Sequence, residues 1–129
     1  MTSATAPAAT GYTGVFCGRP DQVRHARQQI TRYLAGHPAA SDAALIISEM
    51  AANAVLHSQS AGQFFTVRAR LDDTRCHLEV EDCGGPWNPP PRDPSRPYGL
   101  DVIEALTGPG NWGVTGDSTG RIVWVRLTW

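Results

Sequence analysis

The chain has no lysine, and its eleven basic residues are all arginine, against twelve acidic residues. Neither a P-loop nor a Schiff-base site is therefore available, because each of them uses a lysine side chain. The net charge of −1 gives no basic footprint for direct contact with nucleic acid or with an anionic membrane. Apolar runs are also short. None approaches the roughly 20 residues of a membrane-spanning helix, so we expect no contact with a membrane.

Cysteine is scarce and irregularly spaced, at Cys17, Cys76 and Cys83. An odd number of cysteines at such spacing argues against a disulfide framework. Cys76, His77 and Cys83 suggest a metal site at first sight. However, Cys76 and His77 are adjacent on a predicted strand and would point to opposite faces of it. A metal site at these residues is therefore disfavoured.

The length of 129 residues fits one domain, which would bury about two thirds of the surface that its unfolded chain exposes. The N-terminus is rich in small residues and has neither the basic nor the apolar region of a signal peptide. We therefore expect a disordered lead over residues 1–11, a single domain over residues 12–129 and, by default, a cytoplasmic location.

The segment from Ser41 to Ser58 is the most informative part of the sequence. Ser41 fits a helix N-cap, and the residues after it are mainly Ala, Leu, Ile, Met and Val, with no Pro or Gly. Glu49, Asn53 and His57 interrupt this apolar run at intervals of four, so they form one stripe along the predicted helix. A solvated face would more often carry Lys, Arg, Gln or several Glu. We therefore interpret the stripe as a site, with the polar face of an amphipathic helix as the alternative.

Two side chains of this stripe have the chemistry of a metal-dependent site. The amide oxygen of Asn53 is a hard, neutral ligand of the kind that Mg²⁺ accepts while it keeps most of its waters. The carboxylate of Glu49, one turn away, could orient a water or a hydroxyl group as a general base. A lone carboxylate beside a lone carboxamide on an apolar helix therefore indicates chemistry more than solvation.

The other segments alternate between strand and helix patterns. Apolar and polar residues in alternation predict strands, and apolar residues at helical spacing predict helices. In chain order we expect a strand over residues 12–17, helices over 20–34 and 41–58, strands over 63–71 and 76–81, a helix over 99–106, and strands over 112–115 and 121–127. This order predicts an α/β fold, a two-layer sandwich in which a mixed, mostly antiparallel sheet carries all helices on one face.

Two segments with glycine stand beside these elements. In the first, residues 82–86, glycine would let the backbone approach a ligand, and Asp82 could accept hydrogen bonds from an exocyclic amine. A plain Asp-x-Gly turn is the alternative. In the second, Gly99 begins a helix whose free backbone N–H groups suit an anion. Between them, residues 87–97 are dense in proline and predict a stiff loop or lid, with an SH3-type ligand as a weaker alternative.

Together these segments resemble the GHKL nucleotide-binding superfamily (the Bergerat fold), and within it the small anti-sigma-factor serine/threonine kinases of actinobacterial type. The N box of that family is matched by Glu49-Met-Ala-Ala-Asn53-Ala-Val-Leu-His57. The two glycine boxes are matched by Asp82-Cys-Gly84-Gly-Pro86 and by Tyr98-Gly99-Leu100. The closing WGV and VWVRL patterns of residues 112–127 are also typical of this branch. The resemblance covers nearly all of the chain after the first dozen residues.

The resemblance implies roles for the three residues of the stripe. Asn53 would hold Mg²⁺ through its side-chain oxygen, and the ion would bridge the phosphates of ATP. Glu49 would be the catalytic base that activates the attacking hydroxyl group. His57 ends the N box, and for this residue we favour a structural role, as a helix cap or in packing near the lid, over catalysis.

The resemblance also implies how the nucleotide itself is held. Asp82 would accept a hydrogen bond from the amino group of adenine, and Gly84 would leave room for the ring. Gly99 and Leu100 would offer backbone N–H groups to the phosphates. Cofactor binding would thus fall on Asn53 and on these four residues, which come from three separate parts of the chain.

The function implied is that of an ATP-binding regulator of the anti-sigma-factor type, with ATP and Mg²⁺ as cofactors. It would transfer the γ-phosphoryl group to a serine of an anti-sigma antagonist (STAS-type) partner and would sequester a sigma factor; a homodimer is left open. The alternative is a nucleotide-sensing interaction module without significant kinase activity, suggested by the irregular lid. The catalytic domain of a histidine kinase is disfavoured, because we find no dimerisation helix with a phospho-accepting histidine.

Overall fold

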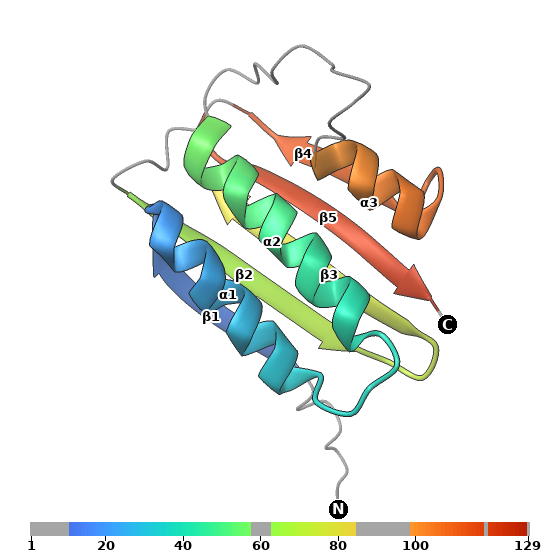
Figure 1. Ribbon diagram of the computed structural model, residues 1–129. Coiled ribbons are helices and arrows are strands. Elements are labelled where there is room, and N and C mark those ends of the chain that lie inside the picture. The colour runs from blue at the N-terminus through green and yellow to red at the C-terminus, as the bar shows by residue number, and fades with distance from the viewer. Residues whose placement is uncertain (1–10, 58–62, 85–98, 118, 129) are drawn as a thin grey trace, which may run out of the picture.

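The helices and strands form two layers in the computed structural model, which describes residues 11–57, 63–84, 99–117 and 119–128. The elements are β1 (Gly11–Cys17), α1 (Pro20–Tyr33), α2 (Ala40–His57), β2 (Phe64–Leu71), β3 (Arg75–Asp82), α3 (Gly99–Thr107), β4 (Trp112–Gly116) and β5 (Arg121–Thr128). In Figure 1 the described helices all cover the same face of the sheet. The predicted two-layer α/β sandwich is therefore confirmed.

The sheet has the strand order β1-β2-β3-β5-β4, and every described pairing is antiparallel. The final hairpin pairs with the rest of the sheet through β5, so β1 and β4 are the edge strands. This order places the end of β3 opposite the beginning of β5, with Asp82 in register with Arg121. Two residues that are far apart in the sequence are thus direct neighbours across the strands.

Strand β3 shows how alternation assigns side chains to the two faces. Cys76, Leu78 and Val80 are buried under the helices, whereas His77 and Glu79 are half-buried on the other face. The predicted opposition of Cys76 and His77 is therefore confirmed. Burial also raises the pKa of the Cys76 thiol to about 11, because desolvation disfavours the thiolate.

Helix α2 lies between α1 and α3 and contacts both of them as well as the sheet (Figure 1). A helix covered on three sides needs an apolar surface around most of its circumference, which explains the long apolar run of its sequence. Its buried side chains are Ala43, Ile46, Ile47, Met50, Ala51, Ala54 and Val55. The polar stripe is therefore an interruption of the most enclosed helix in the described structure.

The start of α2 corrects one detail of the sequence prediction. The helix begins at Ala40, and the carbonyl of Ala39 accepts the first helical hydrogen bond from the backbone N–H of Ala43, at 2.9 Å. The Ala39 N–H donates in turn to Nδ1 of His37, at 3.1 Å. Ser41 is therefore inside the helix and is not its N-cap. The chain is turned into the helix by this short local network instead of by a serine side chain.

Some predicted segments lie outside the described residues. They are the N-terminal lead, apart from Gly11 at the start of β1, and the proline-dense loop with its flanking Pro86 and Tyr98. Among the described helices, none is long and apolar enough to cross a membrane.

Candidate functional site

Glu49 and Asn53 lie one turn apart on α2, and both are half-buried. The residues around them on the helix, Met50, Ala51 and Ala54, are fully enclosed in the core. The two polar groups therefore stand at the border between the core and the surface, where a ligand can reach them. His57 is the last residue of α2, and its side chain lies outside what the structure describes.

Burial raises the pKa of Glu49 above its ordinary value. The cause is desolvation, which disfavours the charged carboxylate. A carboxylate with a raised pKa is a stronger base than an exposed one, and it takes up a proton more readily at neutral pH. The environment of Glu49 is thus suited to general-base chemistry.

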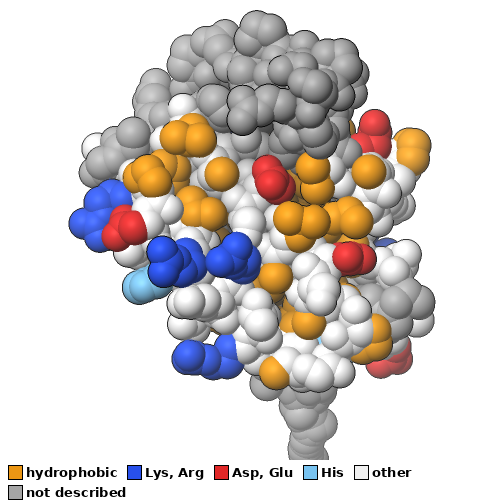
Figure 2. Space-filling view, in the orientation of Figure 1, with side chains coloured by type: hydrophobic (Ala, Val, Ile, Leu, Met, Phe, Trp, Pro, Cys, Tyr) orange, Lys and Arg blue, Asp and Glu red, His pale blue; other side chains and the backbone are white. Residues whose placement is uncertain are grey.

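A groove of about 490 Å³ lies between α1 and α2 and reaches Glu49. Alanine and serine recur at intervals of four along one row of α2, and such short side chains leave room between packed helices. The groove is lined by Arg27, Thr31, Ala40, Ser41, Ala44, Leu45, Ser48 and Glu49. Figure 2 shows basic side chains gathered over α1 on this face of the molecule. Among the residues that line the groove, Arg27 is the basic one and Glu49 the acidic one.

The second part of the candidate site is formed where β3 ends. Asp82, its last residue, is buried, and Oδ1 of its carboxylate accepts a hydrogen bond of 2.7 Å from the backbone N–H of Gly84. Gly84 has φ +75°, in the left-handed region that favours glycine. The glycine at this position is therefore required by the turn that brings its N–H back to Asp82.

Arg121 completes the environment of Asp82, and the sequence prediction missed it. Its Nη2 donates to Oδ2 of Asp82 at 3.0 Å, and both side chains are almost fully buried. A carboxylate offers about four acceptor positions on its two oxygens, so these two contacts leave acceptor capacity for a ligand. The signal that could have revealed Arg121 is its place at the head of the buried row of β5, which continues with Val123 and Val125.

Gly99 and Leu100 are the first two residues of α3, as predicted. The first backbone N–H groups of a helix have no partner within it, so they can face an anion. In Figure 1 the end of α2, the end of β3 and the start of α3 lie at the same end of the molecule. Helix α2 contacts both β3 and α3. The fold thus brings Asp82 and the start of α3 to the end of the molecule where α2 ends, whereas Glu49 lies near the middle of α2.

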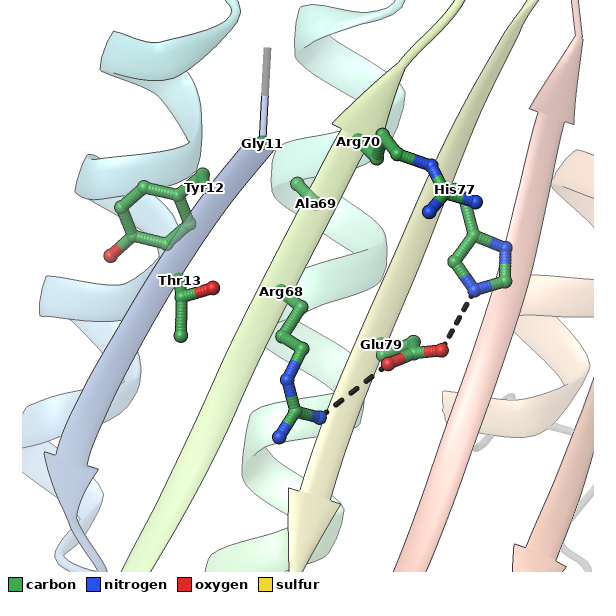
Figure 3. Close-up of a pocket in the computed structure, with 8 residues that line it drawn as sticks. All are labelled: Gly11, Tyr12, Thr13, Arg68, Ala69, Arg70, His77 and Glu79. Atoms are coloured by element: carbon green, nitrogen blue, oxygen red, sulfur yellow. Dashed lines mark hydrogen bonds and ion pairs between the residues drawn. The ribbon is translucent and has the colours of Figure 1, made fainter. Parts of the chain in front are cut away.

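A second hollow, of about 230 Å³, lies on the face of the sheet that the helices do not cover. Figure 3 shows Arg68, His77 and Glu79 in front of the strands, with the helices behind them. Arg68 pairs with Glu79 at 3.5 Å and with Glu81 at 2.7 Å, and His77 Nε2 lies 2.9 Å from Oε2 of Glu79. No residue of the predicted nucleotide motifs lines this hollow.

Comparison with known proteins gives a family match and a structural match. The model of the histidine kinase-like ATPase domain family matches residues 16–125. A crystal structure of the RsbU and RsbW domains of Rv1364c from Mycobacterium tuberculosis is similar, with a TM-score of 0.72 and 22% sequence identity. That match covers 98% of this chain and 33% of the mycobacterial chain, so this chain spans about a third of it. No curated protein matches.

Proposed function

The chain belongs to the histidine kinase-like ATPase domain family, and from that premise we propose that it is an ATP-dependent serine/threonine protein kinase of the anti-sigma-factor type. Its acceptor is a serine of a STAS-type antagonist, and it sequesters a sigma factor when that antagonist is absent or phosphorylated. The fold shared with a structure that includes an RsbW domain supports this branch of the family.

The observation that carries the proposal is the placement of Glu49. Its carboxylate is half-buried, has a raised pKa, stands one turn from Asn53 and borders the groove between α1 and α2. A base beside a metal-binding amide fits phosphoryl transfer, which depends mainly on positioning and on neutralising charge. The groove adds a route by which a protein segment can bring a hydroxyl group to the base.

In this mechanism Glu49 accepts the proton of the serine hydroxyl while the serine oxygen attacks the γ-phosphorus. The new oxygen–phosphorus bond forms as the bond to the bridging oxygen of the β-phosphate breaks, and ADP leaves with that electron pair. Asn53 would hold Mg²⁺ through one amide oxygen, which fits an ion that keeps several waters and also binds phosphate. Bound there, Mg²⁺ supplies charge neutralisation at the phosphates.

The nucleotide is held from two further sides. Asp82 accepts a hydrogen bond from the amino group of adenine, and Gly84 leaves space beside the ring. The backbone N–H groups of Gly99 and Leu100 face the phosphates, where the positive end of the α3 dipole favours negative charge.

Incubation with MgATP and a purified STAS-type antagonist tests the proposal, with phosphoserine on the antagonist measured by mass spectrometry. We expect transfer by the wild type and loss of transfer with Glu49→Gln. Glu104→Gln is the matched control, because Glu104 is an exposed carboxylate on α3 outside the predicted motifs. If Glu49→Gln transferred the phosphoryl group at the wild-type rate, Glu49 would not be the catalytic base.

A second candidate is a nucleotide-sensing interaction module that transfers no phosphoryl group. The exposed leucines of α2 favour it, because Leu45 and Leu56 are 43% and 65% exposed on the helix that also carries Glu49 and Asn53. Apolar side chains at that position would let nucleotide binding influence the docking of a partner protein. Binding of ATP together with background phosphorylation of every antagonist tested would favour this second function.

A further inference from the structure

A buried ion pair joins the end of β3 to the start of β5. Asp82 and Arg121 are 6% and 5% exposed, and they are the buried charged residues of the described part of the chain. They face each other in register, with Arg121 Nη2 and Asp82 Oδ2 at 3.0 Å. Buried charges are costly unless they are paired, so each of these side chains depends on the other.

The surroundings of Asp82 fix the orientation of its carboxylate. Arg121 contacts one oxygen, and the N–H of Gly84 contacts the other. The guanidinium of an arginine is planar and donates in fixed directions, so it constrains the orientation of the carboxylate that it contacts. An ionised carboxylate can only accept hydrogen bonds. Asp82 is therefore held as an acceptor whose direction is set by the backbone of β3 and by the first residue of β5.

We propose that Arg121 is a positioning residue that sets the base selectivity of the site. By holding the carboxylate of Asp82 in one direction, it favours a purine with an amino group at position 6 and disfavours a purine with a 6-oxo group. The inference rests on the proposed function, since Asp82 meets a purine base only if the chain binds a nucleotide there.

The selectivity depends on Arg121 as well as on Asp82, because the guanidinium holds one carboxylate oxygen and the N–H of Gly84 holds the other. Without the guanidinium the carboxylate can turn. It could then accept either from the 6-amino group of adenine or from the N1–H group of a 6-oxo purine. Removal of the guanidinium should thus relax the selectivity without removing the group that contacts the base.

Calorimetric titration of ATP and of inosine triphosphate, each with Mg²⁺, tests this. The two nucleotides share ribose and phosphates. They differ at position 6, which carries an amino or an oxo group, and at N1, which carries a hydrogen only in the 6-oxo base. We expect the wild type to prefer ATP by about 100-fold, within the range expected when a buried acceptor loses its donor. In Arg121→Met the ratio of the two affinities should fall at least about tenfold, and Arg121→Lys, which keeps the charge, should retain most of it.

The matched control is Arg126→Met. Arg126 lies on the same strand, is exposed, and packs its guanidinium over the ring of Trp124 at 4.9 Å. Its loss should leave the ratio unchanged. If Arg121→Met does not fold, the double variant Asp82→Asn/Arg121→Met takes its place, since it has no unpaired buried charge. An amide can both donate and accept, so this double variant should bind the two nucleotides with similar affinity.

The possible results separate the inference from the function on which it rests. If Arg121→Met weakened the binding of both nucleotides equally, the ratio of the two affinities would not change. Arg121 would then be purely structural, and the inference would be overturned. A wild-type ratio in the double variant would overturn it as well. Equal affinity of the wild type for both nucleotides would overturn the base selectivity while the nucleotide site stands. Binding of neither nucleotide by the wild type would overturn the proposed function and this inference together.

Discussion

The two faces of the sheet carry the same kind of charged pair in opposite environments. Under the helices, the Asp82–Arg121 pair has side chains that are 3% and 5% exposed. On the open face, Arg68 is 40% exposed and pairs with Glu79 and Glu81, at 26% and 41%. Both sets bridge neighbouring strands at similar distances. Burial is thus the difference, and we expect it to decide which of the two pairs affects stability more.

The largest contrast should be in phosphoryl transfer, between Glu49→Gln in the helical layer and Glu79→Gln on the open face of the sheet. Each change replaces one half-buried carboxylate by an amide. Loss of the proposed base should reduce phosphoryl transfer by about 10²- to 10⁴-fold, with ATP affinity largely unchanged. Glu79→Gln should leave transfer unchanged. Phosphoserine formation against time measures both, and a similar loss in both variants would contradict the assignment of Glu49.

The next contrast is in stability. Arg121→Met leaves Asp82 buried without its cation, which should reduce the free energy of unfolding by about 3–5 kcal/mol. Arg68→Met breaks a half-exposed pair and should cost no more than about 1 kcal/mol. Chemical denaturation followed by circular dichroism measures both losses. Equal losses would show that burial does not separate the two pairs.

The dependence of these stability losses on salt should also differ between the two pairs, although by a smaller amount. Exposed charges are screened over about 3 Å at 1 M ionic strength, so high salt should weaken the pairs of Arg68. The loss caused by Arg68→Met should therefore shrink between low and high salt, whereas the loss caused by Arg121→Met should change little. Denaturation curves of the variants and the wild type at both salt concentrations provide the test, and a strong salt dependence of Arg121→Met would contradict its burial.

The smallest effect concerns Glu49 and pH. Its pKa is raised in the folded state by desolvation, so the folded state favours the protonated form. The stability that this provides is present below the unfolded pKa and is lost as the pH rises through the raised folded pKa. Glu49→Gln should therefore be slightly more stable than the wild type at neutral pH, and this gain should vanish in acid. Unfolding curves of the wild type and of Glu49→Gln across that pH range measure the difference in stability. A variant that is less stable than the wild type at neutral pH would contradict the prediction.

Most of the fold could be predicted from the sequence, because its elements have clear periodicity. The apolar run of α2 and the alternation of β2 and β3 gave elements whose ends agree with the structure to within a residue or two. The N-cap at Ser41 was wrong, because His37 and Ala39 form the turn into α2 through contacts that no local pattern shows.

The candidate site was only partly predictable. Glu49 and Asn53 were visible because polar side chains interrupt an apolar helix, and Gly84 because of its turn. The alternation of β5 could have shown that Arg121 is buried, but not that it pairs with Asp82, since that contact depends on the pairing of β3 with β5. The metal, the partners and the homodimer stay predictions, as do the roles of the site residues.

Calorimetric titration of ATP into the wild type and into Asn53→Ala, each with and without Mg²⁺, tests the central claim most directly. The account predicts binding by the wild type that is strengthened by Mg²⁺, and a loss of that strengthening in Asn53→Ala. Absence of ATP binding by the folded wild type would contradict it, and so would binding whose dependence on Mg²⁺ is the same in Asn53→Ala.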